Sequence, residues 1–217
     1  MRQLCLQDKL KVVEKLRHFC YAPRVASAIP KDAHVMIIGA MRCGTSSLYS
    51  YLKDHPEICP CKTKEPEFFS DRQKHGVHVR NYNELWNFDR RVHRYALEAS
   101  TGYTKFPMEK NVPANIRAYG IRPKFIYIIR HPFDRLLSHL NFVQSGKSKK
   151  PSPKDMHMLS VSNYYLQLEQ YRPYFAREDF LILDFDELRC RPAALLQTIY
   201  AFLGISADYL PKKFEVL

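Results

Sequence analysis

Val35-Met-Ile-Ile-Gly-Ala-Met-Arg-Cys-Gly-Thr-Ser-Ser-Leu-Tyr-Ser-Tyr-Leu52 predicts a strand, a tight loop and a helix in succession. Residues 35–38 form a short apolar run rich in branched side chains, which is typical of a strand covered on both faces. The loop spans residues 39–44, and the helix is expected to open at Thr45 or Ser46. The unpaired N–H groups of that first helical turn attract anions. The stretch therefore predicts a binding loop for a phosphate or a sulfate.

The residues of this loop distinguish between kinds of phosphate chemistry. A nucleotide-triphosphatase loop reads Gly-x4-Gly-Lys-Ser/Thr, whereas here Gly44 is followed by Thr45 without the lysine. The loop's own cation, Arg42, lies earlier in the turn. This difference argues against magnesium–ATP chemistry and favours an anion that an arginine can clamp without metal. A glycine turn that merely links strand to helix is the alternative.

A family resemblance rests on this loop and on two motifs that follow it. Gly39-Ala-Met-Arg-Cys-Gly-Thr-Ser46 resembles the 5′-phosphosulfate loop of sulfotransferases that use 3′-phosphoadenosine 5′-phosphosulfate (PAPS). Leu52-x2-His55-Pro56 and Lys64-Glu-Pro-Glu-Phe-Phe69 resemble the carbohydrate branch, typified by heparan sulfate sulfotransferases. That branch usually has lysine where this chain has Arg42. The resemblance implies that PAPS is bound by Arg42, Cys43, Gly44, Thr45 and Ser46.

The acidic segment at residues 64–69 is the predicted source of the general base. By resemblance Glu65 occupies the position of the family's base, and an acceptor hydroxyl must lose a proton as its new S–O bond forms. Lys64 and Glu67 flank it as predicted substrate-binding residues, although family members often have histidine in place of Glu67. A surface Glu–Lys pair of little energetic value is the alternative.

A second anion site is predicted downstream, in Lys124-Phe-Ile-Tyr-Ile-Ile-Arg-His-Pro-Phe-Asp-Arg-Leu-Leu-Ser138. Residues 125–129 read as another buried strand, with Arg130 at its carboxyl end, where open α/β sheets bind ligands. The following helix should bury a stripe formed by Phe133, Leu136, Leu137 and Leu140. In the resembling family, the equivalents of Arg130 and Ser138 hold the 3′-phosphate of PAPS. A helix-capping arginine is the alternative.

Three further expectations concern residues around this site. Arg135 is interpreted as a structural ion-pair former. Residues 162–171 read as a helix that Ser162 is expected to cap. The Ser-x-Tyr context makes Tyr164 an adenine-side contact by resemblance, although tyrosines at this spacing are more often core residues. The basic stretch 71–97, with Tyr82 and Trp86 interleaved, is expected to be a solvated face or, alternatively, an acidic-glycan groove.

The whole chain of 217 residues fits a single α/β domain, with an N-terminal helix and linker in residues 1–30. Residues 180–185 predict a further buried strand, and Pro192 and Gly204 bound a further helix. Together these elements predict a P-loop-like parallel sheet of at least four strands with helices on both faces. Family members continue into a further nucleotide-covering loop that has no match here, so we expect the C-terminal part to be missing.

Charge and cysteine content restrict partners and compartment. The net charge of +12 indicates an anionic partner. No membrane-span composition or secretory signal is visible, and dispersed cysteines favour reduced thiols. These features favour the cytoplasm, with a catalytic fragment from the Golgi lumen as the alternative. Cys59-Pro-Cys61 with His55 has poor zinc spacing, so no metal is predicted.

These observations lead to one principal functional prediction: a sulfotransferase that moves a sulfuryl group from PAPS to an acceptor hydroxyl, expected to belong to a carbohydrate and not to a nucleic acid. A carrier-bound or small-metabolite hydroxyl is the nearest alternative. A P-loop kinase and a non-enzymatic anion-binding module are the others, and the missing loop lysine counts against the kinase.

Overall fold

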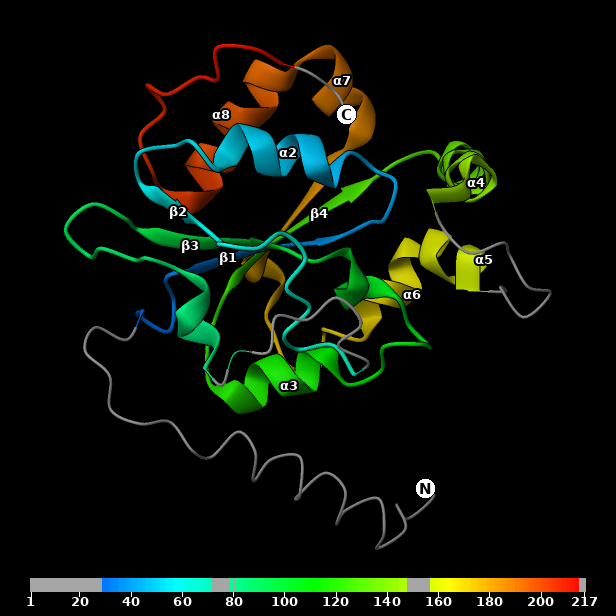
Figure 1. Ribbon diagram of the computed structural model, residues 1–217, viewed down its shortest axis with the longest axis horizontal. Helices are drawn as coiled ribbons and strands as arrows, with labels where there is room; N and C mark the ends of the chain where they lie inside the picture. Colours follow the sequence, from blue (N-terminus) through cyan, green and yellow to red (C-terminus); the bar gives the residue numbers. More distant parts are fainter. Residues whose placement is uncertain (1–28, 72–78, 80, 148–156, 215–217) are drawn as a thin grey trace, which may run out of the picture.

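The computed structural model describes residues 29–71, 79, 81–147 and 157–214, and it contains a five-stranded sheet in the order β2-β3-β1-β4-β5 (Figure 1). All paired strands are parallel. The strands are β1 (His34–Gly39), β2 (Ile58–Pro60), β3 (Tyr95–Ala99), β4 (Lys124–Ile129) and β5 (Phe180–Asp184). The predicted parallel α/β sheet is therefore confirmed.

Strand β1 lies at the centre of the sheet and is buried along its whole length. It pairs with β3 through Val35 and Leu97, and with β4 through Ile37 and Ile126. A strand covered on both faces needs apolar side chains pointing both ways, which explains its continuous apolar run. Strand β5 differs from the prediction, because it is an edge strand and leaves Ile182 51% exposed.

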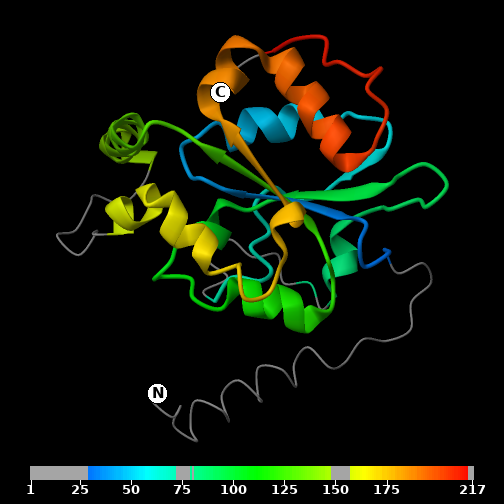
Figure 2. The same ribbon diagram turned by 180° about the vertical axis from the view of Figure 1, so that it is seen from behind.

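Helices cover both faces of the sheet, as Figures 1 and 2 show from opposite sides. On one face lie α2 (Thr45–Leu52), α7 (Phe185–Cys190) and α8 (Pro192–Leu203), and on the other lie α3 (Val112–Tyr119) and α6 (Tyr164–Glu169). Helices α4 (Pro132–Phe142) and α5 (His157–Ser162) lie beyond the carboxyl ends of the strands. None of the helices within the described ranges has the length and apolar character needed to cross a bilayer.

Short helical segments complete the connections. They are η1 (Tyr82–Leu85), η2 (Thr101–Thr104), the π-type turn η3 (Val143–Lys147) that continues α4, and η4 (Arg177–Asp179). Helix α8 begins with Pro192 and ends with Leu203. The next residue, Gly204, has a φ of +62° and forms the left-handed C-cap that the sequence predicts. The predicted N-terminal helix and linker lie outside the described residues, except for residues 29 and 30.

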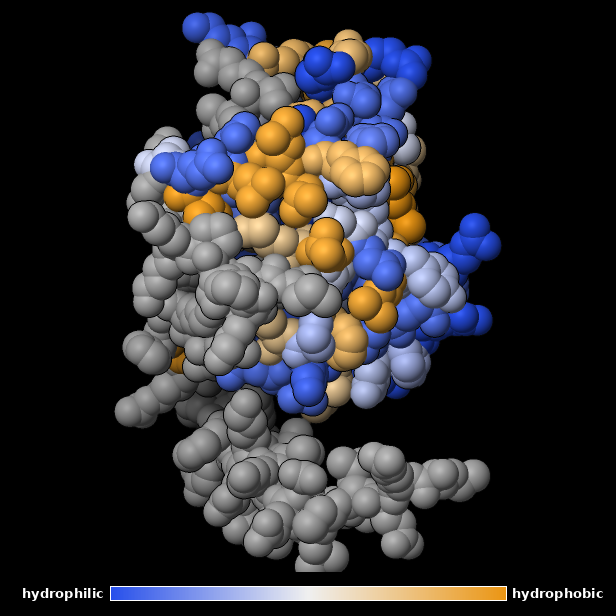
Figure 3. Space-filling model, turned by 90° about the vertical axis from the view of Figure 1, so that its right-hand side faces the viewer, coloured by the Kyte–Doolittle hydropathy of each residue, from blue (hydrophilic) through white to orange (hydrophobic). Residues whose placement is uncertain are grey.

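Helix α4 is rotated relative to the prediction. Phe133 and Leu137, expected in its buried stripe, are 76% and 58% exposed, while Arg135 and His139 are buried. Figure 3 views the molecule from the side on which α4 and α5 project in Figure 1, and it shows apolar side chains scattered among polar ones on that face. The apolar stripe was therefore wrong as a guide to this helix, because its inward face carries polar groups that bond to α5.

Two more sequence expectations are wrong. Tyr82 and Trp86, expected on a solvated face, are buried in an aromatic cluster with Phe69 and His34. Burying an aromatic ring removes a large apolar area from water, which outweighs the effect of the basic residues nearby in the sequence.

Ser162 does not cap α6: the N-cap is Asn163, whose side chain accepts a hydrogen bond from the Leu166 amide at 3.1 Å.

Candidate active site

The loop between β1 and α2 has the geometry of an anion-binding turn. Gly44 is the N-cap of α2 with φ +81°, and Arg42 has φ +70°. A β-carbon on Gly44 would lie 2.8 Å from Leu188 and 3.0 Å from the Phe185 ring, so α7 packs against the loop at this point. The first turn of α2, which begins at Thr45, contains no acidic residue. The N-cap residue makes no side-chain hydrogen bond to its amides, so they are available to an anion.

One pocket brings together the two predicted anion-binding arginines. It has a volume of about 300 Å³ and is lined by Arg42, Arg130, Asp134, Leu137, Ser138 and Asn141. Arg42 follows β1, Arg130 follows β4, and these two strands are neighbours in the sheet. Arg42 donates a hydrogen bond from Nε to Ser138 Oγ at 3.2 Å. Ser138 on α4 thus contacts the first loop directly.

Each pocket arginine lies over an aromatic ring. The guanidinium carbon of Arg42 is 4.7 Å from the centre of the Phe142 ring, and that of Arg130 is 4.6 Å from the Phe185 ring. A ring face attracts a cation and restricts the plane of the guanidinium group. Both cations are therefore held before any ligand binds.

The hydroxyl of Tyr164 joins the two anion turns. It donates to the Arg130 carbonyl oxygen at 2.7 Å, accepts from the Arg130 amide at 3.3 Å, and lies 3.7 Å from Cys43 Sγ. The predicted adenine contact stays a prediction. The observed contacts show instead that Tyr164 links the end of β4 to the β1 loop.

Cys43 is fully buried inside the first loop. Burial raises the pKa of its thiol to about 11, and this outweighs the opposing influence of the Tyr164 hydroxyl and three arginines. The thiol is neutral at physiological pH. A neutral side chain does not repel an anion bound to the loop amides.

The acidic segment lies next to this loop, at the carboxyl end of β3. The Glu65 amide donates to the carbonyl oxygen of Ala99 at 3.0 Å, and its carboxylate accepts from Thr101 Oγ1 at 3.4 Å. Lys64 is exposed and its Nζ donates to Ser46 Oγ in the first turn of α2. The structure therefore brings Lys64 to the first turn of α2 and Glu65 to the carboxyl end of β3, while their roles stay predictions.

Glu67 is placed differently from its neighbour Glu65. Its side chain is only 4% exposed, and a β-carbon on Gly102 would lie 2.3 Å from its carboxylate oxygen, so the segment packs tightly against η2. The Glu67 amide donates to Ser100 Oγ at 3.1 Å, and Ser100 Oγ donates to the buried Glu98 carboxylate at 2.7 Å. Burial raises the pKa of Glu98. Glu67 thus belongs to an interior acidic network with Glu98.

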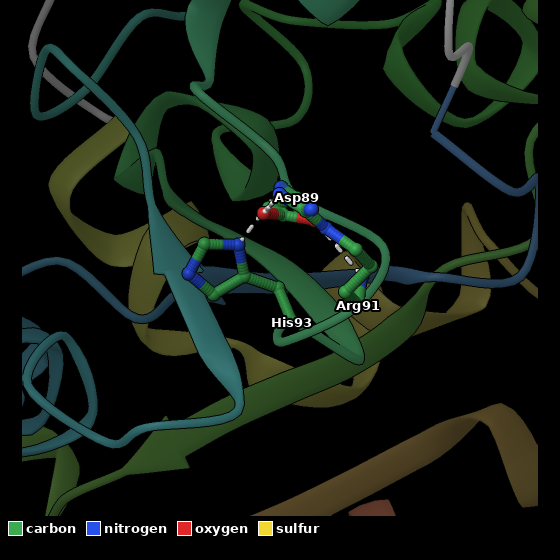
Figure 4. Close-up of polar contacts among 3 residues, drawn as sticks. All are labelled: Asp89, Arg91 and His93. Carbon is green, nitrogen blue, oxygen red and sulfur yellow. Dashed lines mark hydrogen bonds and ion pairs between the residues drawn. The ribbon is translucent and has the colours of Figure 1, made fainter.

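The described part of the basic stretch 71–97 includes a polar turn at the opposite end of the sheet from the pocket. Arg91 makes a forked contact with the Asp89 carboxylate, with Nη2 at 2.7 Å, and the Asp89 amide donates to His93 Nδ1 at 3.0 Å (Figure 4). These contacts with Arg91 lower the pKa of Asp89 to about 2. The turn leads into the amino end of β3, whereas the pocket lies at the carboxyl ends. Its location does not support the acidic-glycan groove.

Within the described ranges, no group of three or more His, Cys, Asp and Glu side chains is arranged to hold a metal ion. Cys59 and Cys61 are buried, and burial raises the pKa of both thiols, that of Cys61 to about 12. The His55 ring is engaged with the Ser206 carbonyl oxygen and the Glu57 amide.

Sequence reasoning missed several residues of the site. Asn141 and Leu137 line the pocket, Phe142 and Phe185 hold the arginines, and Thr101 bonds to Glu65. The spacing of Ser138 and Asn141, one helical turn apart on α4, could have indicated a shared face. Nothing local in the sequence indicates that Phe185, on α7, lies under Arg130.

Comparison with known families identifies this arrangement. The family described as "Sulfotransferase domain" matches residues 32–215, which includes both arginine turns and the acidic segment. The chain belongs to the sulfotransferase domain family. The family implies a transferase, as the sequence analysis predicts.

Two curated relatives are similar in sequence to this sulfotransferase domain. Heparan sulfate glucosamine 3-O-sulfotransferase 5 of Homo sapiens is 26% identical over 199 residues, which cover 84% of this chain and 56% of the relative. Bifunctional heparan sulfate N-deacetylase/N-sulfotransferase 4 of Mus musculus is 25% identical over 199 residues, with 80% and 22% coverage. The chain therefore spans only about half, or less, of these relatives' length.

Solved structures agree on the fold of this sulfotransferase domain. The sulfotransferase from Alicyclobacillus acidocaldarius superposes with a TM-score of 0.70 and 26% identity, covering 86% of this chain and 85% of that one. Mouse sulfotransferase SULT7A1 complexed with PAP has a TM-score of 0.55 and 15% identity, covering 82% and 60%. The second likeness concerns the fold alone.

Proposed function

We propose that this sulfotransferase moves a sulfuryl group from PAPS to a hydroxyl group of a carbohydrate. The observation that supports this proposal most directly is the shared pocket of Arg42 and Arg130. These cations come from neighbouring strand ends, and PAPS carries anionic groups at both its 5′ and 3′ positions. A single pocket with two arginines suits such a doubly anionic nucleotide better than a ligand with one phosphate.

The residues of the two turns divide the binding of the donor between them. Arg42 and the amides of residues 44–46 hold the 5′-phosphosulfate, while Arg130 and Ser138 hold the 3′-phosphate. The Cys43 amide instead donates to the Ala40 carbonyl oxygen at 3.1 Å within the loop. The guanidinium group of Arg42 hardly deprotonates, so it stabilises charge on the departing phosphate oxygen and does not donate a proton to it. The geometry that favours these roles is the hydrogen bond from Arg42 to Ser138, which places both sets in contact.

Glu65 serves as the general base in this scheme. The acceptor oxygen forms a bond to sulfur as sulfur's bond to the bridging phosphate oxygen breaks, and the hydroxyl proton passes to the Glu65 carboxylate. The electron pair of the broken bond stays on the phosphate, which leaves as PAP. Glu65 is suited to this role because Lys64 and Ala99 fix its segment beside the anion loop.

A carbohydrate acceptor is favoured by the relatives and by charge. The two curated relatives are named for heparan sulfate, and the chain carries a net charge of +12. The exposed ammonium of Lys64 is available to an acidic acceptor, whereas buried Glu67 is better suited to supporting the segment. The cytoplasm, with the Golgi lumen as the alternative, stays a prediction for the compartment.

The direct test is transfer of radiolabelled sulfate from PAPS to a panel of heparan sulfate, desulfated heparan, other glycans and small alcohols. Label in a glycan supports the proposal, and label confined to small alcohols would contradict the carbohydrate acceptor. Calorimetry with 3′,5′-ADP beside magnesium–ATP tests the donor site. Tighter binding of magnesium–ATP would favour a kinase instead.

A further inference from the structure

A third arginine, Arg135, lies on α4 and is completely buried. It donates from Nε to Ser162 Oγ at 2.7 Å and from Nη2 to the Met158 carbonyl oxygen at 2.6 Å. Its Nη1 lies 3.4 Å from His139 Nδ1, and because a guanidinium group only donates, this histidine nitrogen is the acceptor. All of these partners are neutral acceptors.

The expected ion pair of Arg135 is not observed. Among the side chains that the structure describes, no aspartate or glutamate forms an ion pair with it. The titratable groups that influence it most are Cys43, Tyr164 and Tyr127. Burial raises the pKa of all three, so each is uncharged at physiological pH. Arg135 therefore carries a positive charge in the interior that no described side chain balances.

An unbalanced interior charge is unfavourable, and proteins usually pair such a group or leave it in contact with water. The location of Arg135 indicates what could balance it. The adjacent face of α4 supplies Asp134, Ser138 and Asn141 to the pocket. The positive charge of Arg135 acts on the Cys43 thiol in the middle of the anion loop, where it lowers the pKa together with Arg130 and Arg42. A cation buried in a low-dielectric interior acts over a longer distance than an exposed one.

We propose that Arg135 determines the anion affinity of the pocket without touching the ligand, because the phosphate groups of the bound ligand supply a counter-charge that the described side chains do not. This inference rests on the proposed function in taking the ligand to be PAPS or PAP. A purely structural tether between α4 and α5 is the competing explanation, since the same side chain joins these helices.

The sharpest test places the missing counter-charge beside Arg135 without removing the arginine. Ser162→Asp introduces a carboxylate at the position that accepts the Nε hydrogen bond, and Ser162→Asn is its matched neutral control. We expect Ser162→Asp to weaken the binding of 3′,5′-ADP by roughly 10- to 30-fold, measured by calorimetry, and Ser162→Asn by less than about threefold. Equal affinities in the two variants, with both folded, would overturn the proposal.

A second comparison separates the electrostatic effect of Arg135 from its role in holding α4 and α5 together. Arg135→Lys keeps the charge but loses the forked hydrogen bonds, while Arg135→Met loses both. We expect Arg135→Lys to retain most of the affinity for 3′,5′-ADP and Arg135→Met to lose roughly 10- to 30-fold. The difference in affinity between the two Ser162 variants should persist at high salt, because interior charges are weakly screened. Equal loss of affinity in both Arg135 variants would favour the tether. Arg91→Met, which removes an equally charged side chain from the far end of the sheet, should leave binding unchanged.

Pyrophosphate serves as a second probe that distinguishes the two proposals. If the protein binds pyrophosphate but not 3′,5′-ADP, the proposed donor is wrong, and the Ser162 pair still tests Arg135 with pyrophosphate. If the protein binds neither anion, Arg135 has no ligand to balance it and the inference fails as well. Should Arg135→Met not fold, the Ser162 pair decides alone.

Discussion

Backbone strain marks individual residues at the candidate site. In the described ranges, the non-glycine residues with positive φ are Arg42, Glu65 and Glu67, at +70°, +54° and +47°. Such conformations cost about 1–3 kcal/mol each and persist where the surroundings enforce them. Two of the three side chains are those to which we assign charge stabilisation and proton transfer. The strain therefore coincides with the residues whose exact placement the chemistry would require.

The first prediction concerns Glu65. Glu65→Gln keeps the size and the contact with Thr101 but removes the proton acceptor, so we expect turnover to fall by about 100-fold or more while 3′,5′-ADP affinity changes by less than about threefold. Initial rates of sulfate transfer and calorimetry provide the two measurements. Glu84→Gln, at an exposed position, is the control for a lost carboxylate. An unchanged turnover in Glu65→Gln would remove Glu65 from the chemistry.

The second prediction separates two costs of replacing Gly44. Both Gly44 and Gly120 have positive φ, +81° and +89°, but a β-carbon meets Leu188 at 2.8 Å in the first case and nothing within 4 Å in the second. Gly120→Ala should lower the free energy of unfolding by about 1 kcal/mol, the conformational cost alone. Gly44→Ala should lower it by about 2–4 kcal/mol and also weaken 3′,5′-ADP binding, because α7 must move. Urea unfolding and calorimetry measure both, and equal costs would show that the contact with α7 is unimportant.

At the scale of elements, the strands and turns next to the ligand could be predicted from sequence. Strands β1 and β4 are buried on both faces, so their apolar runs are continuous and unambiguous. Gly44 and Gly204 lie at helix boundaries with left-handed backbone. Because glycine adopts this conformation most readily, these two residues indicate the boundaries in the sequence. The meeting of Arg42 and Arg130 follows from the rule that parallel strands end at the same edge of the sheet.

Helix orientation could not be predicted in the same way. Periodicity assumes that the apolar side of a helix faces inward, but α4 turns Arg135 and His139 inward. Arg135 donates hydrogen bonds to Met158 and Ser162 on α5, and its Nη1 lies 3.4 Å from His139 Nδ1. The orientation of α4 therefore depends on contacts with residues more than 20 positions away in the chain. The contacts of Tyr164 and Phe185 are similarly distant, so the sequence, which predicts Tyr164 as an adenine contact, does not indicate that its hydroxyl bonds to the Arg130 backbone.

The third prediction concerns the link between two elements that Tyr164 provides. Tyr164→Phe removes the hydroxyl that bonds to both backbone groups of Arg130 and lies beside Cys43, so the end of β4 and the β1 loop lose their connection. We expect a loss of about 1–2 kcal/mol in the free energy of unfolding and a decrease of roughly 10-fold in 3′,5′-ADP affinity. Tyr165→Phe is the matched control, because Tyr165 is 71% exposed. If both variants bind alike, the connection does not position the arginines.

Across the whole molecule, the two ends of the sheet differ in character. The carboxyl ends carry the arginine pocket, while the amino ends carry the Asp89–Arg91 turn and the aromatic cluster around His34. His34 opens the central strand and stacks on Tyr82 with ring centres 5.6 Å apart. Because β1 pairs with strands on both sides, a change of charge on His34 acts on the stability of the entire sheet.

The fourth prediction is therefore a pH dependence of global stability. Burial lowers the pKa of His34 from 6.5 to about 4, which outweighs the opposing effect of Asp32 and nearby backbone groups. The unfolded chain thus binds a proton at a higher pH than the folded protein does. This stabilising contribution is fully present above pH 6.5 and is lost as the pH falls towards 4, by about 3 kcal/mol in total.

The measurement is urea unfolding from pH 7.5 to 4.5 for the wild-type protein and for His34→Gln. Other groups also titrate in this range, and buried Glu98, whose pKa is raised, acts in the opposite direction because protonation favours its folded environment. Only the difference between the two proteins isolates His34, and that difference should shrink as the pH falls. A difference between wild type and His34→Gln that is constant with pH would mean that the buried imidazole accepts a proton without opening the sheet.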